Sequence, residues 1–460
     1  MNSKIEKIYL KLPVFLQNIV IMLYGFNENR IRYSGVYNTF SKEIERNCYL
    51  NDKEVKKWQE NRLRKLFNDA IENVPYYRKN MTLNASEINR FRIEDLKYLP
   101  MLEKNTVKRY ADQFVSESLT EKKIEIHTTG TTGTPLKIIC TPEIRQKNYA
   151  YFNRFLNIAG VDYNGKRATF GGRIIVDYNQ KSSPFWRYSP FQKNMLFSSY
   201  HICEKTIESY TRALQRLRPS YIDAYPSSLY MFAKYAEQKG ISLRGLTKSI
   251  VTSAEVLHPC QREVIEKQFG VPIYDQYGSA EMCVFIAQCS LGKYHIHSDY
   301  SIVEFIKDDG AYAGPGEEAE IVCTGFINPV MPLIRYKIGD RGIVSGDKCK
   351  CGNKFPVLER IIGRSDDYII TPDGRKIGRL SPVLKGYPVR EAQYIQEKPD
   401  EIIVNVVKDA EYNEYTGFKI EDELRKRLGD RIKICINCVN KIERSKGGKY
   451  KTVISRIHES

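Results

Sequence analysis

Apolar residues recur at helical spacing in the early part of the chain. Four of them fall three or four positions apart and so share one face of a helix: Leu63, Leu66, Phe67 and Ile71. Pro75 cannot continue that helix, because its ring removes a backbone donor, and it predicts the end of the helix. The pattern predicts that the first 120 residues are mainly helical.

From residue 121 onward, short apolar runs typical of strands alternate with helical stretches. The strand-like runs are 124–126, 249–252 and 271–274, and the helical stretches include 204–217 and 259–269. Alternation of this kind is typical of a layered α/β architecture, in which helices cover a sheet. We therefore predict an α/β fold for the larger part of the chain.

The last hundred residues follow a different pattern. Two strand-like runs, 401–407 and 432–438, flank the helical stretch 420–428, which suits a small α+β domain. The predicted division is a large N-terminal domain, residues 1–363, followed by a small C-terminal domain, residues 364–460. The boundary is expected near Gly363.

Composition restricts the class of protein. Hydrophobic residues make up 42% and charged residues 28%, which is typical of a folded globular chain and excludes a disordered one. The net charge of +17 would suit nucleic acid, an anionic membrane surface or a phosphate-bearing substrate. No recognition-helix, zinc-finger or aromatic RNA-binding motif occurs, so nucleic acid is not expected as a partner. The 11 cysteines lack the dense spacing of a secreted disulfide framework, which favours a reducing cytoplasm.

The stretch from Leu12 to Phe26 is the candidate for membrane contact. It contains Pro13 and Gln17 and no unbroken apolar run of about 18 residues, so it does not predict a transmembrane helix. No small-residue cleavage site follows, which argues against a signal peptide. Two alternatives remain: a helix packed against the body of the protein, which the pattern favours, and a surface helix attracted to anionic lipid, which gives at most a peripheral membrane contact.

A loop rich in threonine and glycine is the most informative local motif. The string His127-Thr-Thr-Gly-Thr-Thr-Gly-Thr-Pro-Leu-Lys137 follows a strand-like run directly. Its glycines, Gly130 and Gly133, let the backbone turn so that several N–H groups point at one anion. Hydroxyl groups add further donors at Thr128, Thr129, Thr131 and Thr132. The loop is predicted to bind phosphate, although it lacks the Gly-x-x-x-x-Gly-Lys-Ser/Thr pattern.

Five further motifs follow this loop in a fixed order. They are Ser253-Ala-Glu255, Tyr274-Asp-Gln-Tyr-Gly-Ser-Ala-Glu281, Arg335-Tyr-Lys-Ile-Gly-Asp340, Gly363-Arg-Ser-Asp-Asp367 and Gly447-Gly-Lys449. In this order the chain resembles an adenylate-forming enzyme, and within that superfamily it resembles the phenylacetate–coenzyme A ligase family and its capsular-polysaccharide branch. The resemblance covers roughly residues 60 to 455. It implies a large layered N-terminal domain and a small, mobile C-terminal domain.

The resemblance also implies a role for each motif. Lys449 would be the catalytic cation at the α-phosphate of ATP, Glu281 would hold Mg²⁺, and Ser279 would reach an α-phosphate oxygen. Tyr277 offers an aromatic face to adenine and Asp340 accepts hydrogen bonds from the ribose. The implied ATP-binding residues are Thr128, Thr129, Gly130, Thr131, Thr132, Gly133, Ser253, Ala254, Glu255, Tyr277, Gly278, Arg335, Asp340 and Arg364.

The implied reaction has two steps. A small carboxylic acid and ATP give an acyl-adenylate and pyrophosphate, and a thiol, coenzyme A by default, then displaces AMP. The small domain would rotate between the steps about a hinge at Asp366. The setting would be surface polysaccharide biosynthesis, with enzymes of that process as possible partners. Two alternatives stay open: transfer to an amine or hydroxyl of a sugar or carrier, and a non-catalytic scaffold for polysaccharide assembly.

Four residues form a candidate zinc site. Cys349 and Cys351 form a thiol pair at a glycine turn, and Cys289 and His295 lie upstream. Three thiolates and one imidazole make a closed tetrahedral set for Zn²⁺, although this pair is more tightly spaced than the usual Cys-x-x-Cys. Some ligases of the resembled family carry a similar set. His297 is the competing imidazole, and ordinary structural cysteines are the alternative.

Overall fold

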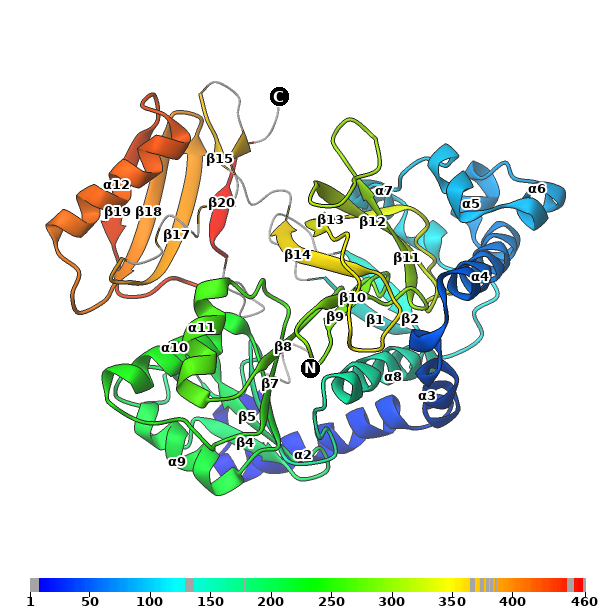
Figure 1. The fold of residues 1–460 in the computed structure, drawn as a ribbon. Helices are drawn as coiled ribbons and strands as arrows, with labels where there is room; N and C mark the ends of the chain where they lie inside the picture. The colour runs from blue at the N-terminus through cyan, green and yellow to red at the C-terminus, as the bar shows by residue number, and fades with distance from the viewer. Residues whose placement is uncertain are drawn as a thin grey trace.

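The computed structural model describes residues 8–128, 136–177, 179–364, 369–372, 376–377, 380, 384, 387–444 and 451–457. Within these residues a large part contains a 12-stranded sheet, and a small part with a four-stranded sheet lies beside it at the upper left of Figure 1. Each part has its own apolar core. The predicted fold class, a layered α/β part followed by a smaller α+β part, is confirmed.

Helices dominate the first part of the chain. Their bounds are α2 (Val14–Tyr33), α3 (Tyr37–Glu45), α4 (Asp52–Asn73), α5 (Pro75–Asn80), α6 (Ala85–Arg90) and α7 (Lys104–Arg109). The helix predicted from apolar spacing is α4, which buries Leu63, Leu66 and Phe67. It begins where the Asn51 side chain accepts hydrogen bonds from two backbone N–H groups, and Pro75 starts the next helix.

The strand before the threonine loop lies outside the large sheet. Strand β1 (Ile124–His127) pairs only with β2 (Lys137–Cys140), antiparallel, in a two-stranded sheet of the described residues. The loop therefore connects the two strands of a hairpin. Helix α8 (Pro142–Ile158) follows and packs against the main core. The sequence pattern predicted β1 but neither β2 nor the pairing of the two strands.

The large sheet is parallel in its centre and antiparallel on both sides. Its strands lie in the order β11-β12-β13-β14-β10-β9-β8-β7-β6-β3-β5-β4. The strands around the parallel centre are β3 (Arg167–Gly171), β4 (Trp186–Ser189), β5 (Asn194–Ser198), β6 (Tyr221–Ala224), β7 (Ser249–Ser253) and β8 (Ile273–Gly278). Helices α9 (Ile207–Leu217), α10 (Pro226–Gln238) and α11 (Pro259–Phe269) connect these strands and cover the sheet, as Figure 1 shows.

The antiparallel half of the sheet follows β8. Its strands are β9 (Phe285–Gln288), β10 (Tyr294–Ile296), β11 (Ser301–Ile306), β12 (Glu318–Gly325), β13 (Tyr336–Val344) and β14 (Val357–Arg364). These strands follow one another without an intervening helix, so the strand–helix alternation used for prediction does not apply to them. Strand β14 ends one residue beyond the predicted domain boundary at Gly363 and still pairs with β13.

The small part is a four-stranded sheet with one helix. Its elements are β17 (Val389–Lys398), β18 (Glu401–Lys408), α12 (Glu414–Leu428), β19 (Lys433–Cys438) and β20 (Val453–Ser455), and a short pair, β15 (Ile369–Ile370) and β16 (Lys376–Ile377), precedes them. The helix begins six residues before the predicted start at residue 420, because the Asn413 side chain accepts a hydrogen bond from the N–H of Thr416 and caps it there. Strand β20 lies parallel to β17 at one edge.

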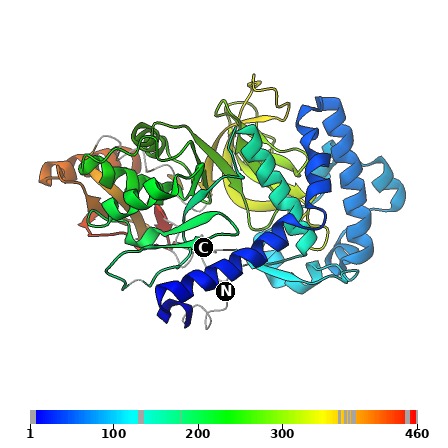
Figure 2. The ribbon, with the colours of Figure 1, turned by 90° about the horizontal axis from the view of Figure 1, so that it is seen from below.

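Helix α2 lies along the surface of the large part, where Figure 2 shows it crossing the lower face. Its Gln17 Oε1 accepts a hydrogen bond of 2.6 Å from Arg187 Nε, and its Asn18 Oδ1 accepts one of 3.2 Å from the backbone N–H of Tyr188. The helix is therefore packed on the body through β4, as the sequence pattern favoured. None of the helices in the described part of the chain combines the length and the apolarity that crossing a bilayer requires.

Candidate active site

Two sequence motifs and the segment that follows β6 lie at one edge of the large sheet. Strands β6, β7 and β8 are parallel, so the residues that follow their carboxyl ends lie at the same edge. The Glu255 carboxylate accepts a hydrogen bond of 3.0 Å from the backbone N–H of Ser227, which joins the segment after β7 to the segment after β6. Ala254 adopts a positive φ of 70°, so the chain turns sharply between Ser253 and Glu255.

Tyr277 and Asp340 are bonded to each other although 63 residues separate them. The Tyr277 hydroxyl, at the end of β8, donates a hydrogen bond of 2.7 Å to Asp340 Oδ2 on β13. Burial, together with the negative charge of Asp340, raises the pKa of this hydroxyl well above its usual value, so it remains a donor. The bond fixes the orientation of the Asp340 carboxylate.

Glu281 is a buried carboxylate with two polar neighbours. Its side chain is 6% exposed, and its Oε1 accepts a hydrogen bond of 3.3 Å from the Tyr336 hydroxyl. The ammonium of Lys104, the first residue of α7, lies 3.7 Å from the same oxygen. Ser279, two residues earlier, has its hydroxyl 3.7 Å from the sulfur of Cys283. A buried carboxylate with one ammonium beside it keeps an oxygen that could ligate a divalent cation.

The base of the threonine loop is closed by Thr128. Its backbone N–H donates to the carbonyl of Leu136 over 2.9 Å, and its hydroxyl oxygen accepts from the N–H of Leu136 over 3.0 Å. Several predicted site residues lie outside the described residues: Thr129, Gly130, Thr131, Thr132, Gly133, Asp366 and Lys449. The backbone of Arg364 pairs with Asp340 across β13 and β14. Gly278 ends β8, between Tyr277 and Ser279.

The four predicted zinc ligands come together. The ligand atoms of Cys289, His295, Cys349 and Cys351 all lie within 4.8 Å of one another. The Cys289 and Cys349 sulfurs are 3.7 Å apart, and the Cys351 sulfur is 3.4 Å from His295 Nε2. The hairpin of β9 and β10 brings Cys289 beside His295, because His295 pairs with the residue two positions before Cys289. His297, the competing imidazole, instead contacts the Arg154 guanidinium through Nδ1 at 2.7 Å.

Comparison with known proteins identifies the chain's relatives. The CapK C-terminal domain family matches residues 369–456. Protein CapK of Staphylococcus aureus is 28% identical over 98% of this chain and 99% of its own length. The phenylacetate-coenzyme A ligase of Thermus thermophilus is 23% identical over 86% of this chain and 95% of its own.

A solved structure gives the same fold. 2-Hydroxyisobutyryl-CoA ligase in its postadenylation state superposes with a TM-score of 0.70, at 18% identity, over 88% of this chain and 90% of its own. Over most of its length the chain is thus similar to CapK and to phenylacetate-coenzyme A ligases, and it has the fold of an acyl-CoA ligase. The predicted resemblance to the phenylacetate–coenzyme A ligase family and its capsular-polysaccharide branch is confirmed, and so is the predicted class of enzyme, an AMP-forming acid ligase.

One predicted ATP-binding residue of this ligase has another role. The Arg335 guanidinium is buried and forms hydrogen bonds of 2.9 to 3.2 Å with the Glu304 carboxylate on β11. Its remaining nitrogen donates to the carbonyl of Leu99. The guanidinium is thus bound inside the large part, which argues against direct contact between Arg335 and ATP. Only the fold places Glu304 opposite it.

Lys104 lies in the candidate site, and sequence reasoning missed it. It precedes the threonine loop by more than 20 residues and belongs to the part of the chain predicted to be mainly helical. Only the fold brings its ammonium to Glu281. No local pattern could have identified it, because a single lysine at a helix start is most often solvated surface.

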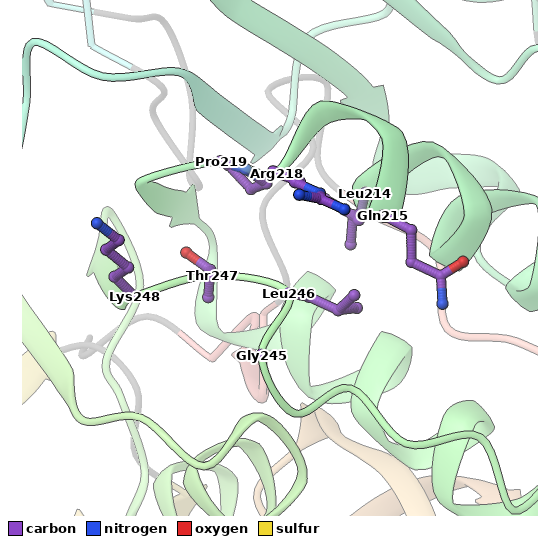
Figure 3. A pocket seen from close by; sticks show the side chains of 8 residues that line it. All are labelled: Leu214, Gln215, Arg218, Pro219, Gly245, Leu246, Thr247 and Lys248. Carbon is purple, nitrogen blue, oxygen red and sulfur yellow. The ribbon is translucent and has the colours of Figure 1, made fainter.

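A shallow cavity of the ligase lies away from this site. It is lined by the end of α9 and the segment before β7, including Leu214, Arg218, Thr247 and Lys248, as Figure 3 shows. These residues precede β6 and β7, so the cavity lies at the amino ends of the parallel strands. The candidate site lies at the carboxyl ends, where ligands of parallel sheets bind. The cavity is therefore separate from the active site.

Proposed function

We propose that this ligase activates a small carboxylic acid with ATP and then transfers the acyl group to a thiol, coenzyme A by default, in surface polysaccharide biosynthesis. The main support for ATP binding is the hydrogen bond between Tyr277 and Asp340, which lies at the edge of the sheet with the other motif segments. The full-length match to CapK supports the biosynthetic setting. The 11 cysteines all lie in the described part of the chain and form no disulfide there, which supports the proposed cytoplasmic location.

In the first step, a carboxylate oxygen of the acid attacks the α-phosphorus of ATP, and the bond from that phosphorus to pyrophosphate breaks. Tyr277 would stack on adenine while its hydroxyl holds Asp340 for the ribose hydroxyls. Ser279, Lys449 and the N–H groups of the threonine loop, which begins at Thr128, would surround the phosphate charge. The buried Glu281 carboxylate fits Mg²⁺, which would neutralise phosphate charge when bound.

In the second step, a thiolate attacks the acyl carbon and the bond to AMP breaks. We propose that the small domain rotates about Asp366 between the steps. A separate sheet and core in residues 389–455 support this proposal. The thioesterification state of 2-hydroxyisobutyryl-CoA ligase matches the chain less well, with a TM-score of 0.58 against 0.70 for the postadenylation state, over the same 88% of the chain.

ATP–pyrophosphate exchange with a panel of carboxylic acids tests this function. Exchange with one acid, followed by release of AMP only when coenzyme A is added, would support the proposal. Release of AMP with an amine or hydroxyl acceptor instead would favour transfer to a sugar or carrier. A chain that exchanges with no acid would be the non-catalytic scaffold.

Nucleotide binding gives a prediction for the Tyr277–Asp340 pair. We expect Mg-ATP to raise the melting temperature, and Asp340→Ala and Tyr277→Ala each to remove most of that rise, because ligand binding stabilises the folded state by mass action. Tyr277→Phe keeps the ring and should lose only part of the rise. Differential scanning fluorimetry measures the effect, with Asp308→Ala as a control, since that side chain is 86% exposed.

The opposite result would favour a basic binding protein. If an oligonucleotide stabilises the chain with a steep dependence on salt concentration, while Mg-ATP does nothing and both alanine variants behave like the parent, the nucleotide site is wrong.

We also propose that Cys289, His295, Cys349 and Cys351 hold a structural Zn²⁺. Their ligand atoms are close enough for one ion, and His295 Nδ1 lies 2.9 Å from the carbonyl of Phe355, which orients Nε2 toward the cysteines. The purified protein should contain about one Zn²⁺ per chain, because a closed set of this kind binds the metal as part of folding.

Cys351→Ser is expected to remove the metal and to lower the melting temperature. In the protein that stays folded, Mg-ATP should still raise the melting temperature as it does in the parent. Cys260→Ser is the matched control, because Cys260 is exposed and lies on α11. Metal analysis and melting curves provide the measurement. Metal-free protein with an unchanged melting temperature would favour ordinary structural cysteines.

A further inference from the structure

Helix α2 contacts the protein with one of its faces. Gln17, Ile21 and Gly25 are buried there, at helical spacing. A Cβ added to Gly25 would lie 2.1 Å from the Ser189 hydroxyl of β4, so the helix backbone lies directly against the sheet edge. This contact determines which side of α2 faces outward.

The outward side of α2 is also apolar. Phe15, Ile19, Leu23 and Phe26 are between 44% and 64% exposed. At 100° per residue they fall within an arc of about 80°, opposite the buried face. Phe191, 50% exposed, extends this surface by packing edge-on against Phe26 with ring centroids 5.1 Å apart. We call these five side chains the α2 apolar surface.

The concentration of apolar side chains here is unusual for the chain. The described residues contain 14 large apolar side chains that are exposed, and seven of them belong to α2, to its flank or to the Phe191 turn: Ile8, Phe15, Ile19, Leu23, Phe26, Tyr33 and Phe191. Scattered exposed apolar residues need no explanation, but a contiguous strip marks a binding surface. In Figure 2 the helix lies on the side facing the viewer, without another element over it.

The charges around the α2 apolar surface are basic. Lys11 and Arg30 are exposed near its two ends, and Lys193 is exposed beside Phe191. The carboxylate of the helix, Glu28, forms an ion pair of 2.6 Å with Arg32. The whole chain carries a net charge of +17. An apolar strip with cationic side chains at its margins is complementary to an anionic lipid surface, which accepts apolar groups between its headgroups and attracts Lys and Arg.

We propose that the α2 apolar surface docks the protein flat on an anionic lipid bilayer. The four helix residues would enter the boundary between headgroups and acyl chains, and Lys11, Arg30 and Lys193 would contact the headgroups. The proposal needs no transmembrane segment, in agreement with the helices described. It extends the proposed function without depending on it, because it concerns a surface on the lower face and not the edge of the sheet where the motifs meet.

Vesicle sedimentation tests the proposal on the full-length chain. We expect the protein to sediment with vesicles of equal parts phosphatidylcholine and phosphatidylglycerol at low salt, and much less with phosphatidylcholine alone. The variant Phe15→Ser/Leu23→Ser/Phe26→Ser should lower the partition coefficient at least tenfold, because three apolar groups no longer leave water on binding. Lys11→Glu/Arg30→Glu should remove the preference for anionic vesicles.

The control variant is Tyr98→Ser/Tyr415→Ser/Phe418→Ser, which removes three exposed aromatic side chains elsewhere on the surface. It should bind vesicles like the parent, and melting curves show that each variant is folded. The proposal is overturned if the parent stays in the supernatant with anionic vesicles, or if both triple variants bind alike. Size-exclusion chromatography with light scattering tests whether a second copy of the chain covers the α2 apolar surface instead. If the parent is a dimer and only the α2 triple variant is a monomer, the proposal is also overturned.

Discussion

Lys449→Ala is expected to lower ATP–pyrophosphate exchange by about 10²–10³-fold, because removing a contact made in the transition state costs roughly 3–4 kcal/mol. The ammonium would contact the α-phosphate only while the acyl-adenylate forms. Thioester formation from supplied acyl-adenylate should therefore remain close to the parent rate. Measuring the two half-reactions separately distinguishes this result from general damage to the protein.

Lys441→Ala is the matched control for this prediction. Lys441 lies in the same C-terminal part, its side chain is 78% exposed, and it pairs with Glu443 at the surface. Lys441→Ala removes the same positive charge as Lys449→Ala, so it shows how much of the effect on exchange comes from the change in net charge alone. Exchange by Lys449→Ala within about tenfold of the parent would contradict the assignment of Lys449 as the catalytic cation.

Arg335→Ala is expected to destabilise the folded protein by about 3–5 kcal/mol, because it leaves the buried Glu304 carboxylate without its cation. Both side chains are almost fully buried, with 6% and 5% exposed. The double variant Arg335→Met/Glu304→Leu removes both charges and should recover much of the lost stability. Melting curves and chemical denaturation of the two variants measure the effect.

Arg341→Ala provides the comparison, on strand β13, which begins directly after Arg335. Arg341 pairs with Asp308 and Glu318, whose side chains are 86% and 39% exposed, so its loss should cost about 1 kcal/mol or less. If Arg335 bound ATP instead, Arg335→Ala would melt like the parent without nucleotide and would lose the rise caused by Mg-ATP.

Much of the fold could be predicted from the sequence wherever the apolar residues of a helix or strand follow a clear pattern. Helices α4 and α11 and strands β7 and β19 follow apolar patterns that their own residues determine. The antiparallel half of the sheet was not accessible, because its strands follow one another without the strand–helix alternation and β10 pairs with β14, which is distant in sequence. The start of α12 was predicted late, because the cap at Asn413 precedes the apolar residues of the helix.

The candidate site could likewise be predicted only in part. Ordered motifs identified Tyr277, Asp340 and Glu281, because each stands at a strand or turn that the family resemblance marks. Their mutual contacts, and those of Lys104 and Arg335, depend on which strands become neighbours. Pairing of strands over long sequence separations is a tertiary property. The choice of His295 over His297 in the cysteine cluster likewise depends on the register of β9 and β10.

The parallel pairing of β17 and β20 fixes the register of the last strand of the small part. Tyr394 N–H donates to the carbonyl of Thr452, and the Gln393 amide donates to the carbonyl of Lys451 over 2.9 Å. A slip of one residue in this pairing would move every residue of β20 by about 3.3 Å along the strand. Catalytic groups tolerate a displacement of only about 0.5 Å. Under the proposed role of Lys449, the register of β20 would therefore matter to catalysis as much as the ammonium itself.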